Sequence, residues 1–153
     1  MIKVYTDGAC SGNGKEGAIG GWAFCVIGEN DELIYSESGA EVNTTNNRME
    51  FTAMLRALQW VEKNLNNNFI EYYTDSALLY NTLTQWIEGW KNNGWKRKTG
   101  EIKNLDLVKQ LYEYSNKNFN HVRGHNGNKD ANSKWNEWCD KAAVAARLAL
   151  EAN

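Results

Sequence analysis

Hydrophobic and polar residues alternate along several short segments of the chain, and this pattern predicts β-strands. The predicted strands cover residues 3–6, 20–27, 33–40, 69–74 and 119–122. The first ends at Asp7-Gly8, from which a glycine-rich turn continues to Gly17. Residues 28–31 form the expected hairpin loop between the second and third strands.

In the segments between these strands, apolar residues recur at the spacing of helices. Helices are predicted at about 48–63, 76–84, 85–92, 104–116 and 134–151, the first with N-cap candidates at 44–47. The element order starts as an antiparallel meander and then requires crossover connections between parallel strands. The predicted fold class is therefore α/β, with a mixed five-stranded sheet of antiparallel and then parallel strands.

The composition narrows the class of protein. The 153 residues are 42% hydrophobic and 24% charged, which suits one domain, 1–153, and excludes wholesale disorder or a fibrous chain. A net charge of −2 excludes a wholly basic nucleic-acid binder but allows a local basic patch. There is no apolar run of about 18 residues, no signal-peptide pattern and no CxxC spacing among the three cysteines. We therefore expect a soluble cytoplasmic protein with no membrane partner.

Two aspartates, Asp7 and Asp75, follow predicted strands in the same context of Thr-Asp and a small residue. Ligands of open α/β sheets gather at the carboxyl ends of parallel strands. If these strands are neighbours, the aspartates lie about 5 Å apart, and carboxylates that close repel unless a cation or a shared proton lies between them. Either aspartate alone could simply cap the next turn or helix. The matched pair favours a functional site.

Glu50 is a third candidate, because it begins a helical stripe that is otherwise apolar. The stripe continues through Met54, Ala57 and Val61. Glu50 should therefore face the sheet, where a buried carboxylate needs a partner. A capping box from Asn47 to Glu50 accounts for the same residue equally well.

Asp140 is a fourth candidate on the last predicted helix. It shares its stripe with Ala143, Val144 and Leu148, which places an acid on the core side. It could instead be a surface residue that pairs with Lys141 or Lys134.

Four acids of this kind suit hard divalent cations, Mg²⁺ above all, because these ions prefer oxygen ligands. Two such ions about 4 Å apart can activate a water and stabilise a leaving oxygen in phosphoryl transfer. His125 lies between glycines in the segment RGHNG, where an imidazole could move a proton or ease product release. Without the carboxylates it would be an ordinary exposed loop histidine. His121 is assigned to structure, inside the last predicted strand.

Tryptophans alternate with basic residues over 85–98, QWIEGWKNNGWKRK. Five basic residues and one acid between Lys91 and Lys103 give a local charge of +4, so the rest of the chain carries −6. This asymmetry indicates a surface for a polyanion. Phosphate contact is the favoured role of the basic run 96–98, whereas Trp86 could simply pin a helical hairpin. Acids beside such a patch suit an enzyme that cuts nucleic acid.

Several segments together resemble the signature motifs of type 1 ribonuclease H. They are 5–13 (YTDGACSGN), 44–50 (TTNNRME), 73–76 (YTDS), 122–125 (VRGH) and 136–143 (NEWCDKAA). The stretch 83–107 resembles the basic handle of bacterial members, which we place at about 85–104. The similarity covers almost the whole chain in order, and it implies the ribonuclease H fold, with helices on both faces of the sheet.

The resemblance also implies an activity and a set of site residues. The activity is metal-dependent endonucleolytic cleavage of the RNA strand of an RNA–DNA hybrid, leaving 3′-hydroxyl and 5′-phosphate ends, with two Mg²⁺ or Mn²⁺ ions. By motif position, Asp7 would bridge both ions, with Glu50, Asp75 and Asp140 as the other ligands. Glu50 would also contact a ribose 2′-hydroxyl, and His125 would assist proton transfer or product departure.

Further positions would contact the hybrid. They are Asn13, Thr45, Asn46, Gln85, Trp86, Lys91, Lys96, Arg97 and Lys98. The expected partner is thus an RNA–DNA hybrid, bound by a monomer. Two departures from the family pattern stand out: residues 129–135 look like an insertion before Asp140, and the turn after Asn13 has no proline.

Two rival functions remain at this point. One is a hybrid-binding or duplex-RNA-binding module whose site is degenerate, against which the four acids argue. The other is a different nuclease of the same superfold, such as a junction resolvase or an integrase-like enzyme. The handle and the segment 44–50 favour ribonuclease H over that second rival.

Overall fold

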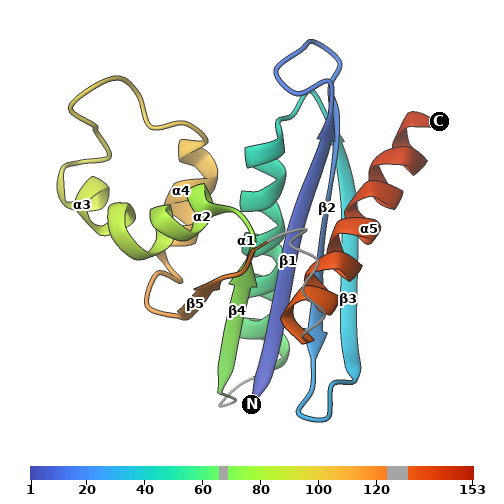
Figure 1. Ribbon diagram of the computed structural model, residues 1–153. Helices are drawn as coiled ribbons and strands as arrows, with labels where there is room; N and C mark the ends of the chain where they lie inside the picture. Colours follow the sequence, from blue (N-terminus) through green and yellow to red (C-terminus); the bar gives the residue numbers. More distant parts are fainter. Residues whose placement is uncertain (66–68, 124–130) are drawn as a thin grey trace.

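The computed structural model describes residues 1–65, 69–123 and 131–153. One mixed sheet contains β1 (Ile2–Ser11), β2 (Ile19–Ile27), β3 (Leu33–Val42), β4 (Ile70–Thr74) and β5 (Asn118–His121). The strands lie in the order β3-β2-β1-β4-β5 (Figure 1). The first three strands pair antiparallel, and β4 pairs parallel with β1 and with β5. This arrangement confirms the predicted mixed five-stranded sheet.

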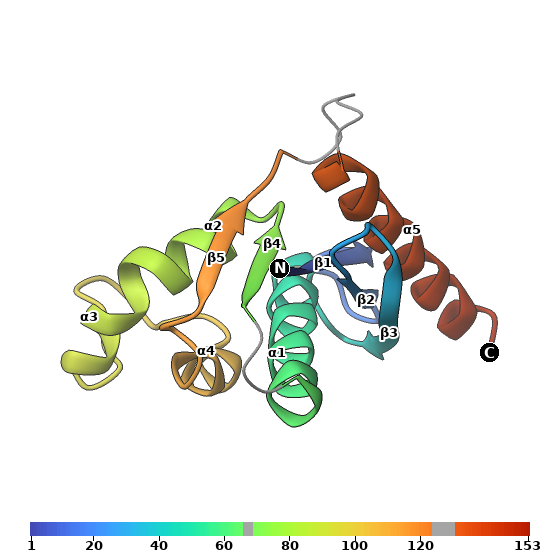
Figure 2. The same cartoon turned by 90° about the horizontal axis from the view of Figure 1, so that it is seen from below.

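Helices cover both faces of the sheet. They are α1 (Asn46–Asn64), α2 (Ala77–Asn81), the π-helical turn η1 (Thr82–Trp86), α3 (Ile87–Asn92), α4 (Leu105–Tyr112) and α5 (Ala131–Glu151). Figure 2 shows α1 and α5 on opposite sides of the sheet, with α2, α3 and α4 gathered beside β4 and β5. Among the described residues, no helix combines the length and apolar character needed to cross a bilayer.

Side chains of the central strands pack alternately into two hydrophobic cores, because successive residues of a strand point to opposite faces of the sheet. Val4, Phe24 and Tyr72 join the larger cluster on the side of α1. Their neighbours Tyr5, Cys25 and Tyr73 join a smaller cluster under α5, with Trp135 and Cys139 from that helix. Burial on both faces explains why these strands read as nearly continuous apolar runs.

The first strand is longer than its sequence pattern predicts. It runs through Asp7-Gly8 to Ser11 and pairs with β2 along this length, so the predicted glycine-rich turn over 8–17 is wrong in its first half. The Asp-Gly pair is typical of a turn, but Gly8 serves a close approach instead. A Cβ there would lie 2.6 Å from the backbone N of Glu50, so only glycine lets α1 come this near.

Two helix predictions also need correction. The separate helices expected at 76–84 and 85–92 follow one another without a break from α2 through η1 to α3. The last helix begins at Ala131 rather than 134, so the described part of the apparent insertion extends α5 at its N-terminus. It is held there by Asp31, which accepts hydrogen bonds from Lys134 Nζ (2.8 Å) and Trp135 Nε1 (2.5 Å).

Candidate active site

The strands that lead to Asp7 and Asp75, β1 and β4, are neighbours in the sheet, which is the condition that the sequence set for the two aspartates to meet. In the parallel pairing of β1 with β4, Tyr5 is opposite Tyr73, so the two aspartates follow two residues later on neighbouring backbones. Asp75 comes directly after the end of β4, whereas Asp7 lies inside the longer β1. The sheet register therefore brings the two carboxylates together.

Glu50 reaches the same point from α1. The helix is capped by Thr45, whose hydroxyl accepts a hydrogen bond from the Arg48 N–H at 3.1 Å, which argues against the Asn47–Glu50 capping box. Glu50 is 6% exposed in the first turns of this helix. One carboxylate oxygen from each of Asp7, Glu50 and Asp75 lies within 4.8 Å of the others.

Asp140 approaches from α5, on the other side of the sheet. It lines the same open cavity of about 560 Å³ as Asp7, Glu50 and Asp75. Both lysines that could have paired with it at the surface bind elsewhere: Lys141 with Glu137 at 3.3 Å and Lys134 with Asp31. Asp140 is half-buried and lines the cavity, which agrees with the prediction that it lies on the core side of its helix, although it stands outside the tight group of three acids.

Two of the acids, Asp7 and Glu50, favour their protonated forms when no cation is present. Burial, together with the negative charge of Asp75, raises the pKa of Asp7 to about 8, and the charge of Asp140 adds to this effect. Burial also raises the pKa of Glu50 well above its ordinary value, helped by the charges of Asp7 and Asp75. Carboxylates out of water and beside one another favour the neutral form unless a positive charge joins them.

The same acids leave buried oxygens without partners. Asp7 Oδ2, Glu50 Oε1 and Asp75 Oδ1 are buried and accept no hydrogen bond. Such a group is costly in a protein interior unless another ligand satisfies it. Three oxygens that converge within 4.8 Å, in a cavity lined by a fourth acid, fit a hard divalent cation such as Mg²⁺.

Comparisons with known proteins agree with this geometry. The family model for RNase H matches residues 1–147. The chain belongs to the ribonuclease H family. This membership confirms the predicted class of enzyme, an endoribonuclease directed at the RNA strand of RNA–DNA hybrids.

Individual relatives cover most of the chain. It is 42% identical to a ribonuclease H of Francisella tularensis subsp. novicida over 92% of this chain and 90% of that protein. It is 37% identical to a ribonuclease H of Rhodopirellula baltica over 95% and 89%. Among solved structures, LC9-RNase H1, described as a type 1 RNase H with the type 2 active-site motif, is similar with a TM-score of 0.80 and 30% identity, over 97% of this chain and 72% of that one.

Two of the residues to which the resemblance to ribonuclease H assigns contact with the hybrid lie beside the acid cavity. Asn13 Oδ1 accepts a hydrogen bond from the Asn46 N–H at 2.9 Å, so the turn after β1 meets the start of α1. Asn46 also lines the cavity. Between them along the chain, Thr45 has a structural role as the N-cap of α1.

The remaining candidates form an exposed surface away from the sheet. Gln85 donates a hydrogen bond to Asn81 at 3.2 Å, and Trp86 is 39% exposed, with its ring 6.0 Å from that of Trp90. Lys91 Nζ lies 5.5 Å from the centre of the Tyr112 ring, which ties α3 to α4. The basic residues 96–98 are exposed and form no ion pair with any described residue.

His125 lies outside the described residues, so its predicted role stays a prediction. The structure instead places His121 near the site: its Nε2 is 3.2 Å from the backbone oxygen of Asp75. The sequence assigned this residue to β5, where it is found, but not to the neighbourhood of an acid. Cys10 and Leu78 also line the cavity, and neither carries a chemical signal that sequence reasoning could have used.

Proposed function

We propose that this ribonuclease H hydrolyses the RNA strand of hybrids in the cavity lined by Asp7, Glu50, Asp75 and Asp140, with two divalent cations, Mg²⁺ or Mn²⁺. Two observations support this: one carboxylate oxygen from each of Asp7, Glu50 and Asp75 lies within 4.8 Å of the others, and each of these acids has a buried oxygen without a hydrogen-bond partner. A cation would satisfy these oxygens and favour the charged forms that burial now disfavours.

Two divalent ions bound to these acids would activate a water and stabilise the leaving oxygen of the phosphodiester. The protein's own part is to hold its ligands in fixed positions. Asp7, inside a paired strand, is the candidate for the ligand common to both ions, and Glu50, Asp75 and Asp140 supply the rest. Glu50 can also accept a hydrogen bond from a ribose 2′-hydroxyl, which only the RNA strand offers. His125 would take or return a proton as the 3′-hydroxyl and 5′-phosphate ends separate.

The hybrid would extend from the cavity toward the basic handle. Asn13 and Asn46 stand beside the acids, where they would contact the minor groove. Gln85 would also contact the minor groove. The exposed basic residues 96–98 would contact phosphates of the DNA strand, and Lys91 and Trp86 would line the channel for that strand. The four acids come from one chain, so we propose a monomer, acting as a single domain over 1–153. Its free thiols, Cys10, Cys25 and Cys139, suit the proposed cytoplasm.

A strand-labelled substrate panel tests this function. The full chain is incubated with Mg²⁺ and an RNA–DNA hybrid, single-stranded RNA, duplex RNA or duplex DNA, and the ends of the products are identified. We expect cleavage of the RNA strand of the hybrid alone, with 3′-hydroxyl and 5′-phosphate ends. Hybrid binding without turnover in Mg²⁺ or Mn²⁺ would favour a binding module, and cleavage of duplex DNA would favour another nuclease of this fold.

A further inference from the structure

The turn between β1 and β2, residues 12–17, carries Asn13 and is intrinsically loose. Its backbone passes through the left-handed region at Gly12 (φ 67°), Gly14 (φ 81°) and Gly17 (φ 78°). Glycine has the largest conformational freedom to lose, and no proline restricts this turn. Two backbone hydrogen bonds close the turn, from Lys15 N–H to the Gly12 carbonyl at 2.8 Å and from Ala18 N–H to the Lys15 carbonyl at 3.2 Å, and contacts at its base fix it to the rest of the molecule.

Two of these contacts reach the segment that leads into α1. Asn43 Oδ1 accepts a hydrogen bond from the Gly17 N–H at 2.9 Å, and Asn13 Oδ1 accepts one from the Asn46 N–H at 2.9 Å. The position of the turn and the position of the first residues of α1 are thus coupled. Asn13 and Asn46 are two of the three candidate minor-groove contacts, and Gln85 is the third.

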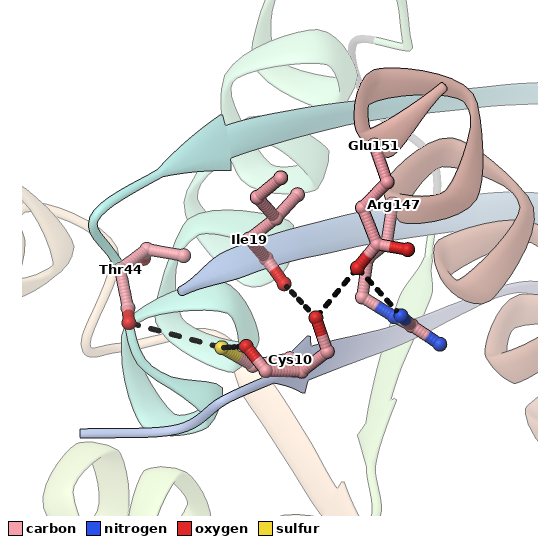
Figure 3. Close-up of polar contacts among 6 residues, drawn as sticks. Cys10, Ile19, Thr44, Arg147 and Glu151 are labelled. Carbon is pink, nitrogen blue, oxygen red and sulfur yellow. Dashed lines mark hydrogen bonds and ion pairs between the residues drawn. The ribbon is translucent and has the colours of Figure 1, made fainter. Parts of the chain in front are cut away.

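A third contact comes from the far end of α5 (Figure 3). The Ser11 hydroxyl donates a hydrogen bond to Glu151 Oε1 at 2.6 Å, and Arg147 Nη1 donates to the same oxygen at 2.9 Å. The Ile19 carbonyl is 3.4 Å from the Ser11 hydroxyl, so the single proton of this hydroxyl favours the nearer, charged acceptor. The side chains of Arg147 and Glu151 are 19% and 30% exposed.

Ser11 stands at the last position of β1, immediately before the turn, and pairs with Ile19 at the first position of β2. The preceding residue, Cys10, lines the acid cavity and has its Sγ 3.7 Å from the Thr44 carbonyl oxygen. The contact from α5 therefore acts on the base of the turn, between the cavity and Asn13.

We infer that Ser11, Arg147 and Glu151 form a clamp that orders the turn 12–17 and so positions Asn13 for the RNA–DNA hybrid. Ser11 and Glu151 are positioning residues in this account, since neither lies among the acids. The inference rests on the proposed function. The helix α5 then has two roles, because it carries Asp140 of the acid cavity in its middle and Arg147 and Glu151 of the clamp in its last turns.

Two measurements on the full chain test the clamp. The first needs no hybrid: amide hydrogen exchange at Gly17 and Asn46 should be about 3- to 10-fold faster in Ser11→Ala and in Glu151→Ala than in the wild type. Ser11→Thr keeps the hydroxyl and should restore slow exchange. Glu137→Ala is the matched control, because it breaks the Glu137–Lys141 pair of the same helix, which does not touch the turn.

The second measurement is steady-state cleavage of the hybrid. Ser11→Ala should raise KM about 3- to 10-fold and leave kcat within about twofold, with rescue by Ser11→Thr. In an Asn13→Ala background, Ser11→Ala should have no further effect, because residues that act as a unit are not additive. A general loss of stability would add to the effect of Asn13→Ala instead.

The outcomes separate this inference from the proposed function. If the wild type cleaves the hybrid but Ser11→Ala changes neither exchange nor KM, or if its effect adds fully to that of Asn13→Ala, the clamp is wrong. If the wild type does not cleave or bind the hybrid, the proposed function fails and the role of the clamp in hybrid binding fails with it. The exchange data still decide whether Ser11 and Glu151 order the turn.

Discussion

The surroundings of Asp7 determine its hydrogen bonding and its pKa. It lies 2% exposed inside a β-strand, and its side chain accepts a hydrogen bond from the Gly8 N–H at 2.9 Å. Its other carboxylate oxygen has no partner, and its pKa is raised to about 8 by burial and by Asp75. A residue in this state destabilises the metal-free protein, which is the expected cost of a preformed cation site.

This cost predicts an unusual dependence of stability on pH. The folded state binds the Asp7 proton more tightly than the unfolded state, whose pKa is about 3.8, so the stability of the metal-free chain should fall as pH rises from about 4 to 8. Asp7→Asn removes this loss. At pH 8 in chelator, we expect the variant to have a Tm at least about 3 °C above the wild type, with little difference at pH 4.

Asp106→Asn is the control for this comparison. In the wild type, the Asp106 carboxylate accepts hydrogen bonds from Arg48 at 3.0 and 2.6 Å, which hold the pKa of Asp106 below its usual range. The stability that this pair contributes to the folded protein is therefore present at neutral pH and is lost in acid. That variant should lose stability at pH 8. An Asp7→Asn chain that melts below the wild type at pH 8 would contradict the account of Asp7.

Packing of β1 against α1 sets the site at the level of elements. Gly8 lets the start of α1 approach the strand, and a Cβ at that position would lie 2.6 Å from backbone atoms of Met49 and Glu50. Backbone on one side and a paired strand on the other leave little room to adjust. The distance between Asp7 and Glu50 therefore depends on the absence of one methyl group.

Gly8→Ala should separate these two elements. We expect a destabilisation of about 1–3 kcal/mol, measured by denaturant unfolding, and a loss of cleavage larger than the loss of hybrid binding. Gly89→Ala is the matched control, because nothing lies within 4 Å of its Cβ position in helix α3 and alanine should stabilise that helix by about 0.5–1 kcal/mol. Unchanged stability and cleavage in Gly8→Ala would show that α1 can shift freely.

Sequence reasoning succeeded where a local pattern decides the outcome. The strand and helix types follow from periodicity, and the mixed sheet follows from their order. It placed the end of β1 wrongly, because Asp-Gly is typical of a turn and the approach of α1 that requires Gly8 is a long-range contact. The sequence could not decide whether Glu50 belongs to a capping box or is a buried acid, because the contact of α1 with the sheet is also long-range. The Asp31 contacts that hold the start of α5, and the clamp on Ser11, join residues more than 100 positions apart.

The acidic cavity and the basic surface lie in different parts of the molecule. The acids converge in the cavity beside β1 and β4, whereas the basic residues stand at α3 and the loop after it, to one side of the sheet (Figure 1). Trp95 and Tyr112 hold that loop to α4 with their rings 5.7 Å apart and nearly perpendicular. A net charge of −2 therefore conceals a surface suited to a polyanion.

Replacing Lys96, Arg97 and Lys98 together with alanine should weaken hybrid binding and flatten its dependence on salt. With each phosphate contact that is lost, binding releases fewer counterions. The magnitude of the slope of log K against log salt concentration should therefore decrease by up to about 2.7. The charge-matched control replaces Lys63, Lys117 and Lys141, which are exposed elsewhere on the molecule. Equal slopes for the two triple variants would show that the handle does not contact phosphate.

The most direct test of the account is single-turnover cleavage of a strand-labelled RNA–DNA hybrid, measured against Mg²⁺ concentration for the wild type and for Asp7→Asn. We expect the wild type to cut only the RNA strand, with a rate that depends on Mg²⁺. Asp7→Asn should bind the hybrid but cut it at least about 100- to 1,000-fold more slowly at every Mg²⁺ concentration. Cleavage by Asp7→Asn at the wild-type rate would contradict the assignment of the acid cavity as the catalytic centre.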